Sequence, residues 1–296
     1  MVAFLKPLVG WLRFSINYGM ASHALLVPFI SLYLVWPLRK ELASKIKASP
    51  MVAIVPLVLG LLLIVAYWTG IRGGWQPKEN DYLAICILAF LLFFIAGCFL
   101  FFGAKVMRSA AFPAAFLIFM VPLPIFLTNA MTLFLQHASA ETAHALLQLS
   151  GTPFFRTGLT FQLPGISLQV AEECSGIRSS LVLLITGLLA AQIFLRTPWK
   201  KALLTFAVIP LGILRNGFRI FAISLLCVHV DPSMIDSPLH HRGGPVFFAL
   251  SLVPFFLLLL WLRRSDFRGQ RAEAGNRTDD KAPTSEVGSR SEIAKD

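Results

Sequence analysis

The sequence predicts an all-α polytopic membrane protein, a bundle of about seven to eight transmembrane helices with a small extracytoplasmic insertion that resembles a β-hairpin. Hydrophobic residues make up 56% of its 296 positions, and the mean hydropathy is +0.73, which exceeds what the core of a soluble protein requires. Apolar residues gather in stretches of about 20, the length of a helix that crosses a bilayer. Basic residues alternate between rich and poor loops, as they do in multi-pass membrane proteins.

The expected spans are the apolar stretches between charged breaks. They cover residues 22–38, 51–71, 82–104, 109–130, 176–195, 202–229 and 245–262. Residues 1–21 are either an N-terminal surface segment or a degenerate span, because Lys6 and Arg13 interrupt an otherwise apolar sequence. A transmembrane domain is therefore expected over residues 22–262.

Two segments between the fourth and fifth spans differ from the rest. In residues 131–150, polar side chains enter an apolar pattern, which predicts a helix lying at the membrane interface. The polar residues are Gln136, His137, Glu141, His144 and Gln148. Residues 151–172 are rich in Thr, Phe, Leu and Gly and contain Pro153 and Pro164, which predicts an outer β-hairpin.

The orientation follows from the loops, because cytoplasmic loops carry the excess of Lys and Arg. One set of loops holds most of these residues: Arg39, Lys40, Lys45, Lys47, Lys105, Arg108, Arg196, Lys200, Lys201, Arg263 and Arg264. This set is predicted to be cytoplasmic, which puts residues 72–81, 151–175 and 230–244 outside. The net charge of +11 mostly reflects this topology and indicates no nucleic-acid partner. The polar tail, residues 263–296, lacks apolar periodicity and is predicted to be a disordered cytoplasmic extension.

One of the four cysteines differs from the other three, which lie in apolar spans and are expected to pack as small hydrophobic side chains. Those three are Cys86, Cys98 and Cys227. Cys174 lies at the outer boundary, just before a helix expected to begin near Gly176. A helix N-terminus and a nearby arginine such as Arg178 favour the thiolate, whereas Glu172 and Glu173 oppose it if they lie close. These residues alone leave both a nucleophile and a structural thiol open.

The span 202–229 contains the polar residues Arg215, Asn216 and Arg219. Spacings of three and four residues put Arg215 and Asn216 on the helix face of Arg219. A charge within the bilayer costs at least about 2.5 kcal/mol, so a functional role is the default interpretation. The alternative is a structural arginine paired with an acidic side chain or a backbone carbonyl.

The third polar set is His240 and His241, in the outer loop ahead of the last span and followed by Gly243 and Gly244. Imidazole can move a proton near neutral pH, although loop histidines also occur as plain surface residues. Zinc bound by Cys174 and these histidines is a further option, but no CxxC or HExxH spacing supports it. Neither a metal nor another cofactor is therefore expected.

Cysteine, histidine and arginine on the outer side suffice for a thiol acyl transferase. A thiolate at Cys174 would attack a peptide carbonyl, His240 would protonate the leaving amine, and Arg219 would stabilise the oxyanion. The resulting thioester could pass to water or to an amine.

Several motifs occur in a fixed order along the chain. They are "VAEECSGIRS" around Cys174, "NGFR" as Asn-x-x-Arg ending at Arg219, "HHRGG" read as His240-x-x-x-Gly244, "SHALLVP" from Ser22 and "PLP" from Pro122. In these motifs the chain resembles the exosortase/archaeosortase family of polytopic membrane cysteine transpeptidases. The resemblance runs from about residue 20 to residue 262.

The resemblance implies that Cys174, Arg219 and His240 are catalytic. It implies supporting roles for Arg178, Asn216, Arg215, His241, Gly244 and Glu173. His241 competes with His240 for one role, and the spacing to Gly244 favours His240.

The resemblance also implies a substrate class. The substrates would be exported, membrane-inserted proteins that end in a short motif such as Pro-Glu-Pro, a transmembrane helix and a basic cluster. Cleavage would pass through a thioester to an unknown glycan or lipid acceptor. The enzyme would lie in the inner (cytoplasmic) membrane of an exopolysaccharide-producing Gram-negative bacterium, with its site facing the periplasm and its C-terminus in the cytoplasm.

Two other function classes remain open. An intramembrane protease of the CAAX-protease-like type would use a glutamate-activated water, but Glu173 and Arg178 are one residue too far apart for its Glu-Glu-x-x-x-Arg signature. A transporter or assembly factor would bind an anionic glycan or lipid at Arg215 and Arg219. Both alternatives predict that replacing Cys174 has no effect.

Overall fold

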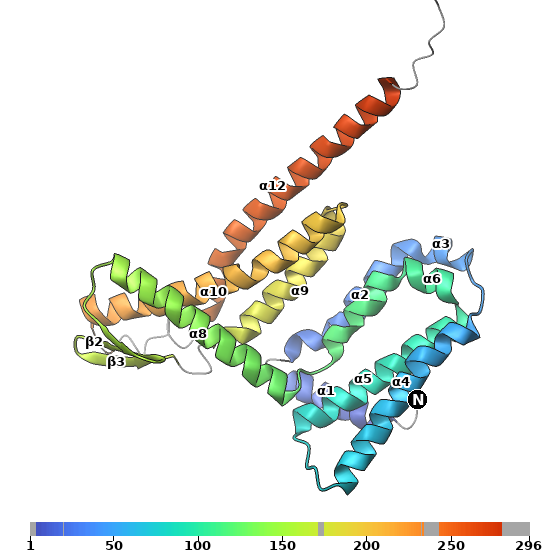
Figure 1. Ribbon diagram of the computed structural model, residues 1–296, viewed down its shortest axis with the longest axis horizontal. Helices are drawn as coiled ribbons and strands as arrows, with labels where there is room; N and C mark the ends of the chain where they lie inside the picture. Colours follow the sequence, from blue (N-terminus) through green and yellow to red (C-terminus); the bar gives the residue numbers. More distant parts are fainter. Residues whose placement is uncertain (1–3, 20, 171–174, 232, 234–242, 280–296) are drawn as a thin grey trace, which may run out of the picture. The chain divides into compact units, whose positions relative to one another are not determined.

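The computed structural model describes residues 4–19, 21–170, 175–231, 233 and 243–279, with side chains described up to residue 267. The chain divides into two compact units, Met1–Phe134 and Leu135–Asp296. Helices dominate both of them (Figure 1).

The first unit is entirely helical in its described residues. Its elements are α1 (Leu5–Asn17), η2 (Ser22–Leu25), α2 (Val27–Val35), η3 (Trp36–Leu38), α3 (Arg39–Ala43), α4 (Pro50–Arg72), α5 (Glu79–Phe101), α6 (Ala104–Ser109), α7 (Ala111–Phe116) and η4 (Leu117–Met120). The long helices α4 and α5 pack side by side (Figure 1). Many of their large hydrophobic side chains are exposed, as expected of helices that face lipid. Helix α1 has 13 residues, which is too short to cross a bilayer unaided.

The turn between α5 and α6 requires a glycine. Gly103 has φ +87°, and a Cβ there would lie 1.7 Å from the Lys47 carbonyl oxygen. Only glycine combines that backbone conformation with so close an approach. The turn thereby holds the α3–α4 connection against the start of α6, where Lys47 N also donates to Phe102 O at 3.3 Å.

Six helices of the described chain are long and apolar enough to cross a membrane, which confirms the predicted class of fold. They are Ser22–Ala43, Pro50–Arg72, Glu79–Phe101, Ile177–Phe194, Pro198–His229 and Gly244–Phe267. A seventh crossing exists if the bent pair Ala111–Met120 and Ile125–Leu149 is one span.

That bent pair corrects the prediction of one span over residues 109–130 and a separate helix over 131–150. The chain turns by 90° between Met120 and Ile125, because Pro122 and Pro124 lack backbone N–H groups and disfavour helix in the residues before them. The next helix, α8 (Ile125–Leu149), runs through the boundary expected at 130. The Asp81 carboxylate caps its first residue, accepting a hydrogen bond from Ile125 N at 2.8 Å.

The second unit begins within α8 and contains a small sheet: β1 (Phe155–Thr157), β2 (Thr160–Leu163) and β3 (Ile166–Gln169). The strands are antiparallel in the order β1-β2-β3. The predicted hairpin is thus extended by a third strand. Phe161 of β2 is fully buried against Leu147 of α8 and Ile220 of the long helix α10 (Pro198–His229), so the sheet is anchored to two helices.

Three helices complete the second unit: α9 (Ile177–Phe194), α10 and α12 (Gly244–Asp279). They share a core that includes Leu183, Val208 and Phe255. Helix α12 continues past Arg263 to Asp279, so its end does not coincide with the boundary expected at residue 263.

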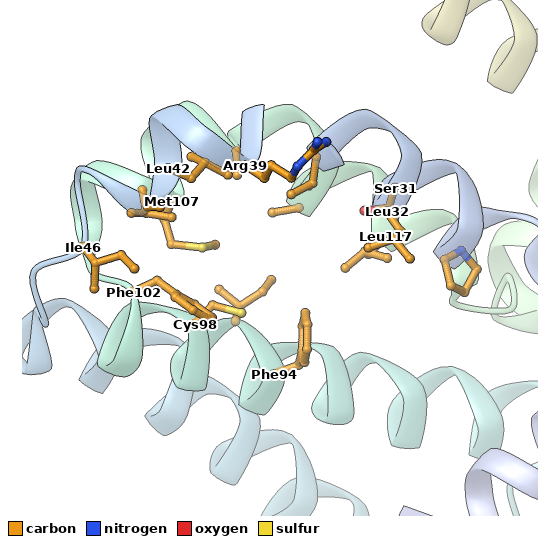
Figure 2. A pocket seen from close by; sticks show the side chains of 17 residues that line it. Ser31, Leu32, Arg39, Leu42, Ile46, Phe94, Cys98, Phe102, Met107 and Leu117 are labelled. Atoms are coloured by element: carbon orange, nitrogen blue, oxygen red, sulfur yellow. The ribbon is translucent and has the colours of Figure 1, made fainter. Parts of the chain in front are cut away.

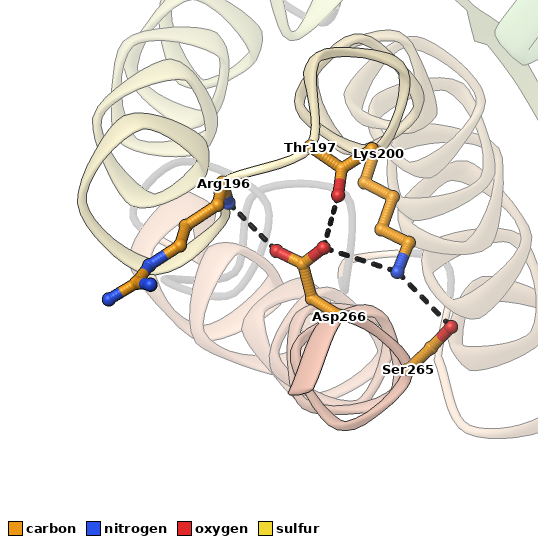
Figure 3. A network of polar contacts seen from close by, with 5 residues as sticks. All are labelled: Arg196, Thr197, Lys200, Ser265 and Asp266. Carbon is orange, nitrogen blue, oxygen red and sulfur yellow. Dashed lines mark hydrogen bonds and ion pairs between the residues drawn. The ribbon is translucent and has the colours of Figure 1, made fainter. Parts of the chain in front are cut away.

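A buried polar network lies at the end of the apolar part of α12. Asp266 of α12 accepts hydrogen bonds from Arg196 N at 2.8 Å, from Thr197 Oγ1, and from Lys200 Nζ at 3.3 Å. Lys200 also donates to Ser265 at 3.3 Å (Figure 3). The network ties the turn between α9 and α10 to α12.

Candidate functional site

The polar residues predicted within α10 are buried in the second unit. The exposed fractions of Arg215 and Asn216 are 8% and 3%, and Arg219 is half-buried one turn further on. The predicted shared face is therefore present, and it points into the protein.

Arg215 holds the N-terminus of α9. Its Nη2 atom donates to the carbonyl oxygen of Gly176 at 3.3 Å and lies 3.4 Å from Ser180 Oγ. Gly212, one turn earlier on α10, makes room for this approach, since a Cβ there would lie 2.9 Å from Ser180 Oγ. The guanidinium thus reaches the first turn of the neighbouring helix.

Gly176 occupies a position that disfavours any residue with a Cβ. Its φ is +72°, and a Cβ would lie 3.1 Å from both Arg215 Nη2 and the Asn216 amide. A residue with a Cβ would meet backbone strain and displace both polar side chains. The close contact fixes the backbone two residues after Cys174, which itself lies outside the described residues.

Helix α8 supports the same region from the other side. Asn216 Nδ2 donates to Ser139 Oγ at 3.0 Å. Gly217 allows the two helices to approach, since a Cβ there would lie 2.4 Å from Thr142 Cβ. Gln136 Nε2 donates to Val170 O at 3.0 Å. Helix α8 therefore also holds Val170, the residue directly after β3.

These contacts bracket the segment 171–174. Val170, on its N-terminal side, is held by Gln136 and by a hydrogen bond from its N to Leu159 O at 3.0 Å. Gly176, on its C-terminal side, is held by Arg215. The described backbone on both sides of the segment is therefore held by buried side chains of α8 and α10.

Arg219 lines a small cavity between α10 and the end of β3. Its other walls include Asn216, Leu168, Gln169 and Val170, and its volume is about 10 Å³. That is roughly the space of one water molecule. The cavity places the Arg219 side chain next to the end of β3.

The other predicted site residues fall into two groups, those outside the described residues and those placed on α9 and α12. Cys174, Glu173, His240 and His241 lie outside the described residues. Gly244 begins α12, and the Arg178 side chain is exposed on α9. No group of three or more His, Cys, Asp or Glu side chains in the described ranges could hold a metal ion.

Sequence reasoning missed the contribution of α8. Ser139 and Gln136 contact the site, whereas the polar residues of this segment by themselves predict a helix at the membrane interface. A usable signal was present: Ser139 and Ala143 are small residues four apart, and both are fully buried, a spacing typical of close helix packing in membranes.

Comparison with known proteins gives one match. Residues 16–273 match the family model described as transmembrane exosortase. No curated protein and no solved structure matches the chain.

Proposed function

The chain belongs to the transmembrane exosortase family, and from this premise we propose that it is a cysteine-dependent transpeptidase that cleaves C-terminal sorting signals. Its substrates would be membrane-inserted proteins with a short motif, a transmembrane helix and a basic cluster. The expected site would face the periplasm of a bacterial inner membrane, with the C-terminus in the cytoplasm.

One observation carries the proposal. Two buried side chains of α10, Arg215 and Asn216, pack against Gly176, two residues after the proposed nucleophile. A buried arginine in a membrane helix requires compensation, and here it donates to the carbonyl oxygen of Gly176. This arrangement supports a function for the buried charge in positioning the thiol and stabilising the thiolate.

The proposed reaction uses three residues. The Cys174 thiolate attacks the scissile carbonyl carbon and forms a C–S bond, while Arg219 stabilises the oxyanion. The C–N bond then breaks, and His240 protonates the leaving amine. An acceptor amine or water attacks the thioester and gives its proton to His240, and Cys174 leaves as the thiolate.

Arg215 has further capacity for hydrogen bonding. Its Nη1 atom is buried and has no hydrogen-bond partner among the described residues. A buried donor without a partner is costly, so a substrate oxygen or a group of the segment 171–174 would be a favourable acceptor.

The sheet supports peptide presentation. Val170 N donates to Leu159 O, and this bond fixes which residue pairs of β2 and β3 exchange backbone hydrogen bonds. In an antiparallel pair only every second residue of β3 bonds to β2. The backbone groups of Ser167 and Gln169 therefore point to the opposite edge, and both side chains are exposed. An extended sorting motif could add to this edge as a strand.

The test is processing of a reporter that carries such a signal, followed by immunoblot in cells that also express the full-length protein. We expect the wild type to shorten the reporter and Cys174→Ala, Cys174→Ser and His240→Ala to fail. Cys86→Ala is the matched control, because Cys86 is a half-buried free thiol in the first unit. Processing by Cys174→Ala would contradict the thiol mechanism.

The buried charge of Arg215 also favours a second candidate, a transporter or assembly factor for an anionic glycan or lipid. That function predicts that Arg215 and Arg219 variants lose activity while Cys174→Ala retains it. A CAAX-protease-like peptidase differs again, since it predicts that Glu173→Gln abolishes processing and Cys174→Ala does not.

A further inference from the structure

The first unit contains an apolar cavity of about 660 Å³. One wall is formed by α2, α3, α6, α7 and η4, and the other by α5. Figure 2 shows Leu42 and Met107 on one side of the hollow and Phe94, Cys98 and Phe102 on the other. Its walls are hydrocarbon and sulfur over almost their whole extent, so the occupant must be apolar in the part that enters.

The size of the cavity distinguishes between apolar occupants. A whole transmembrane helix about 30 Å long and 10 Å across has a volume of roughly 2,400 Å³, so the cavity could admit only some of its side chains. A volume of 660 Å³ is typical of sites for small molecules, and a lipid acyl chain is an apolar ligand of that class. The cavity is therefore suited to hydrocarbon rather than to a partner helix.

Arg39 is the charged residue of the lining. In Figure 2 its aliphatic stem lies along the wall and its guanidinium lies at the edge of the hollow. The guanidinium stacks on Trp36, 4.2 Å from the ring centroid, and Nη1 donates to Trp36 O at 3.1 Å. An arginine has five N–H donors, so this exposed group retains the capacity to bind an anion.

Further basic residues gather at the same end of the unit. The segment after α3 packs against the α5–α6 turn, where Lys45 Nζ lies 3.3 Å from Ser109 Oγ and Ala104 N donates to Ser49 Oγ at 3.1 Å. The basic residues of this region are Lys45 and Lys47, which follow α3, and Lys105 and Arg108 of α6. The loop-charge rule puts this end in the cytoplasm, where the leaflet is rich in anionic lipid.

We propose that this cavity binds one acyl chain of an anionic glycerophospholipid from the cytoplasmic leaflet, with the lipid phosphate at Arg39. The apolar walls accept the chain, and the cationic rim selects the headgroup. The inference is independent of the proposed peptidase chemistry, because every lining residue belongs to the first unit.

Native mass spectrometry of the full-length protein tests it. The purified protein is mixed with equal amounts of phosphatidylglycerol and phosphatidylcholine that carry identical acyl chains. We expect one phosphatidylglycerol to remain bound in preference. Equal retention of the two lipids overturns the proposal.

Two kinds of variant separate the chain from the headgroup. Arg39→Gln should weaken phosphatidylglycerol binding about fivefold, the effect of one basic residue near an anionic surface. Lys40→Gln is the matched control, since Lys40 is exposed on the same turn and does not line the cavity. Equal losses in the two variants would indicate general surface charge and contradict a specific site.

Cys98→Phe should fill the cavity and abolish retention of either lipid. Ala114→Phe, from the opposite wall, fills the same space and replaces it if the first variant fails to fold. Undiminished binding of phosphatidylglycerol to a folded, filled variant overturns the proposal.

Discussion

The Arg215 guanidinium donates a hydrogen bond to the carbonyl oxygen of Gly176, over 3.3 Å. This bond links the middle of the long helix α10 to the first turn of α9. It explains how a charge is held within an apolar bundle: a backbone carbonyl at a helix N-terminus is one of its acceptors. It also connects the buried charge to the chain immediately after Cys174.

Replacing Gly176 by alanine should abolish reporter processing. The left-handed φ of +72° costs a residue with a Cβ about 1–2 kcal/mol, and the added Cβ would press on Arg215 and Asn216 at 3.1 Å. Gly151→Ala is the matched control, because Gly151 has φ +70° with no atom within 4 Å of the Cβ position among the described residues. Similar thermal stabilities with processing lost only in Gly176→Ala confirm the prediction, whereas equal activity contradicts it.

Replacing Arg215 by lysine should reduce processing at least about tenfold. Lysine keeps the charge, but its single ammonium group does not reproduce the planar fork of the guanidinium, which lies near both Gly176 O and Ser180 Oγ. The rate of reporter shortening measures the effect. Arg264→Lys, at an exposed position of α12, makes the same chemical change and should process at the wild-type rate. A fully active Arg215→Lys protein would show that charge alone is sufficient.

The hydrogen bond between Asn216 and Ser139 should contribute measurably to stability. A double-mutant cycle with Asn216→Ala and Ser139→Ala, measured by unfolding in mixed micelles, should give a coupling of about 0.6 kcal/mol, the average for such bonds in membrane proteins. The pair lies 3.0 Å apart and both residues are buried. Additive single effects would show that the two side chains do not interact.

The Asp266 network should be the most sensitive electrostatic element of the second unit. The Lys200 and Asp266 side chains are only 8% and 6% exposed, and removing one member of a buried pair costs about 3–5 kcal/mol. Asp266→Asn should therefore lower the free energy of unfolding by about 3 kcal/mol. Asp266→Leu combined with Lys200→Met should recover part of that loss, because it leaves no buried charge.

An exposed ion pair provides the comparison for Asp266. Glu41 and Lys45 form a pair whose side chains are 56% and 37% exposed, and such pairs contribute about 0–1 kcal/mol. Glu41→Gln should change the unfolding free energy by less than about 1 kcal/mol. If it destabilises as much as Asp266→Asn, burial is not the reason for the sensitivity of Asp266.

Much of the fold was predictable because hydrophobicity and helical period are local properties. The spans around Pro50–Arg72 and Glu79–Phe101 follow from uninterrupted apolar runs, and the inward face of Arg215 and Asn216 follows from the 3.6-residue period. The strands within 151–172 follow from turn residues and β-forming composition. The span 109–130 was wrong, because a hydropathy window averages over Pro122 and Pro124 and does not register the 90° bend between the helices on either side.

The sequence by itself determined that this is a polytopic membrane protein of the exosortase family, with two arginines on one face of a helix. Only the tertiary structure decided what those arginines contact. The Arg215–Gly176 bond, the Ser139 and Gln136 supports and the Asp266 network join residues 30 or more positions apart. Such contacts depend on which helix faces meet and how closely. Gly176 and Gly217 allow close approach because they have no Cβ. The sequence does not show which neighbouring residue occupies the space beside each of them.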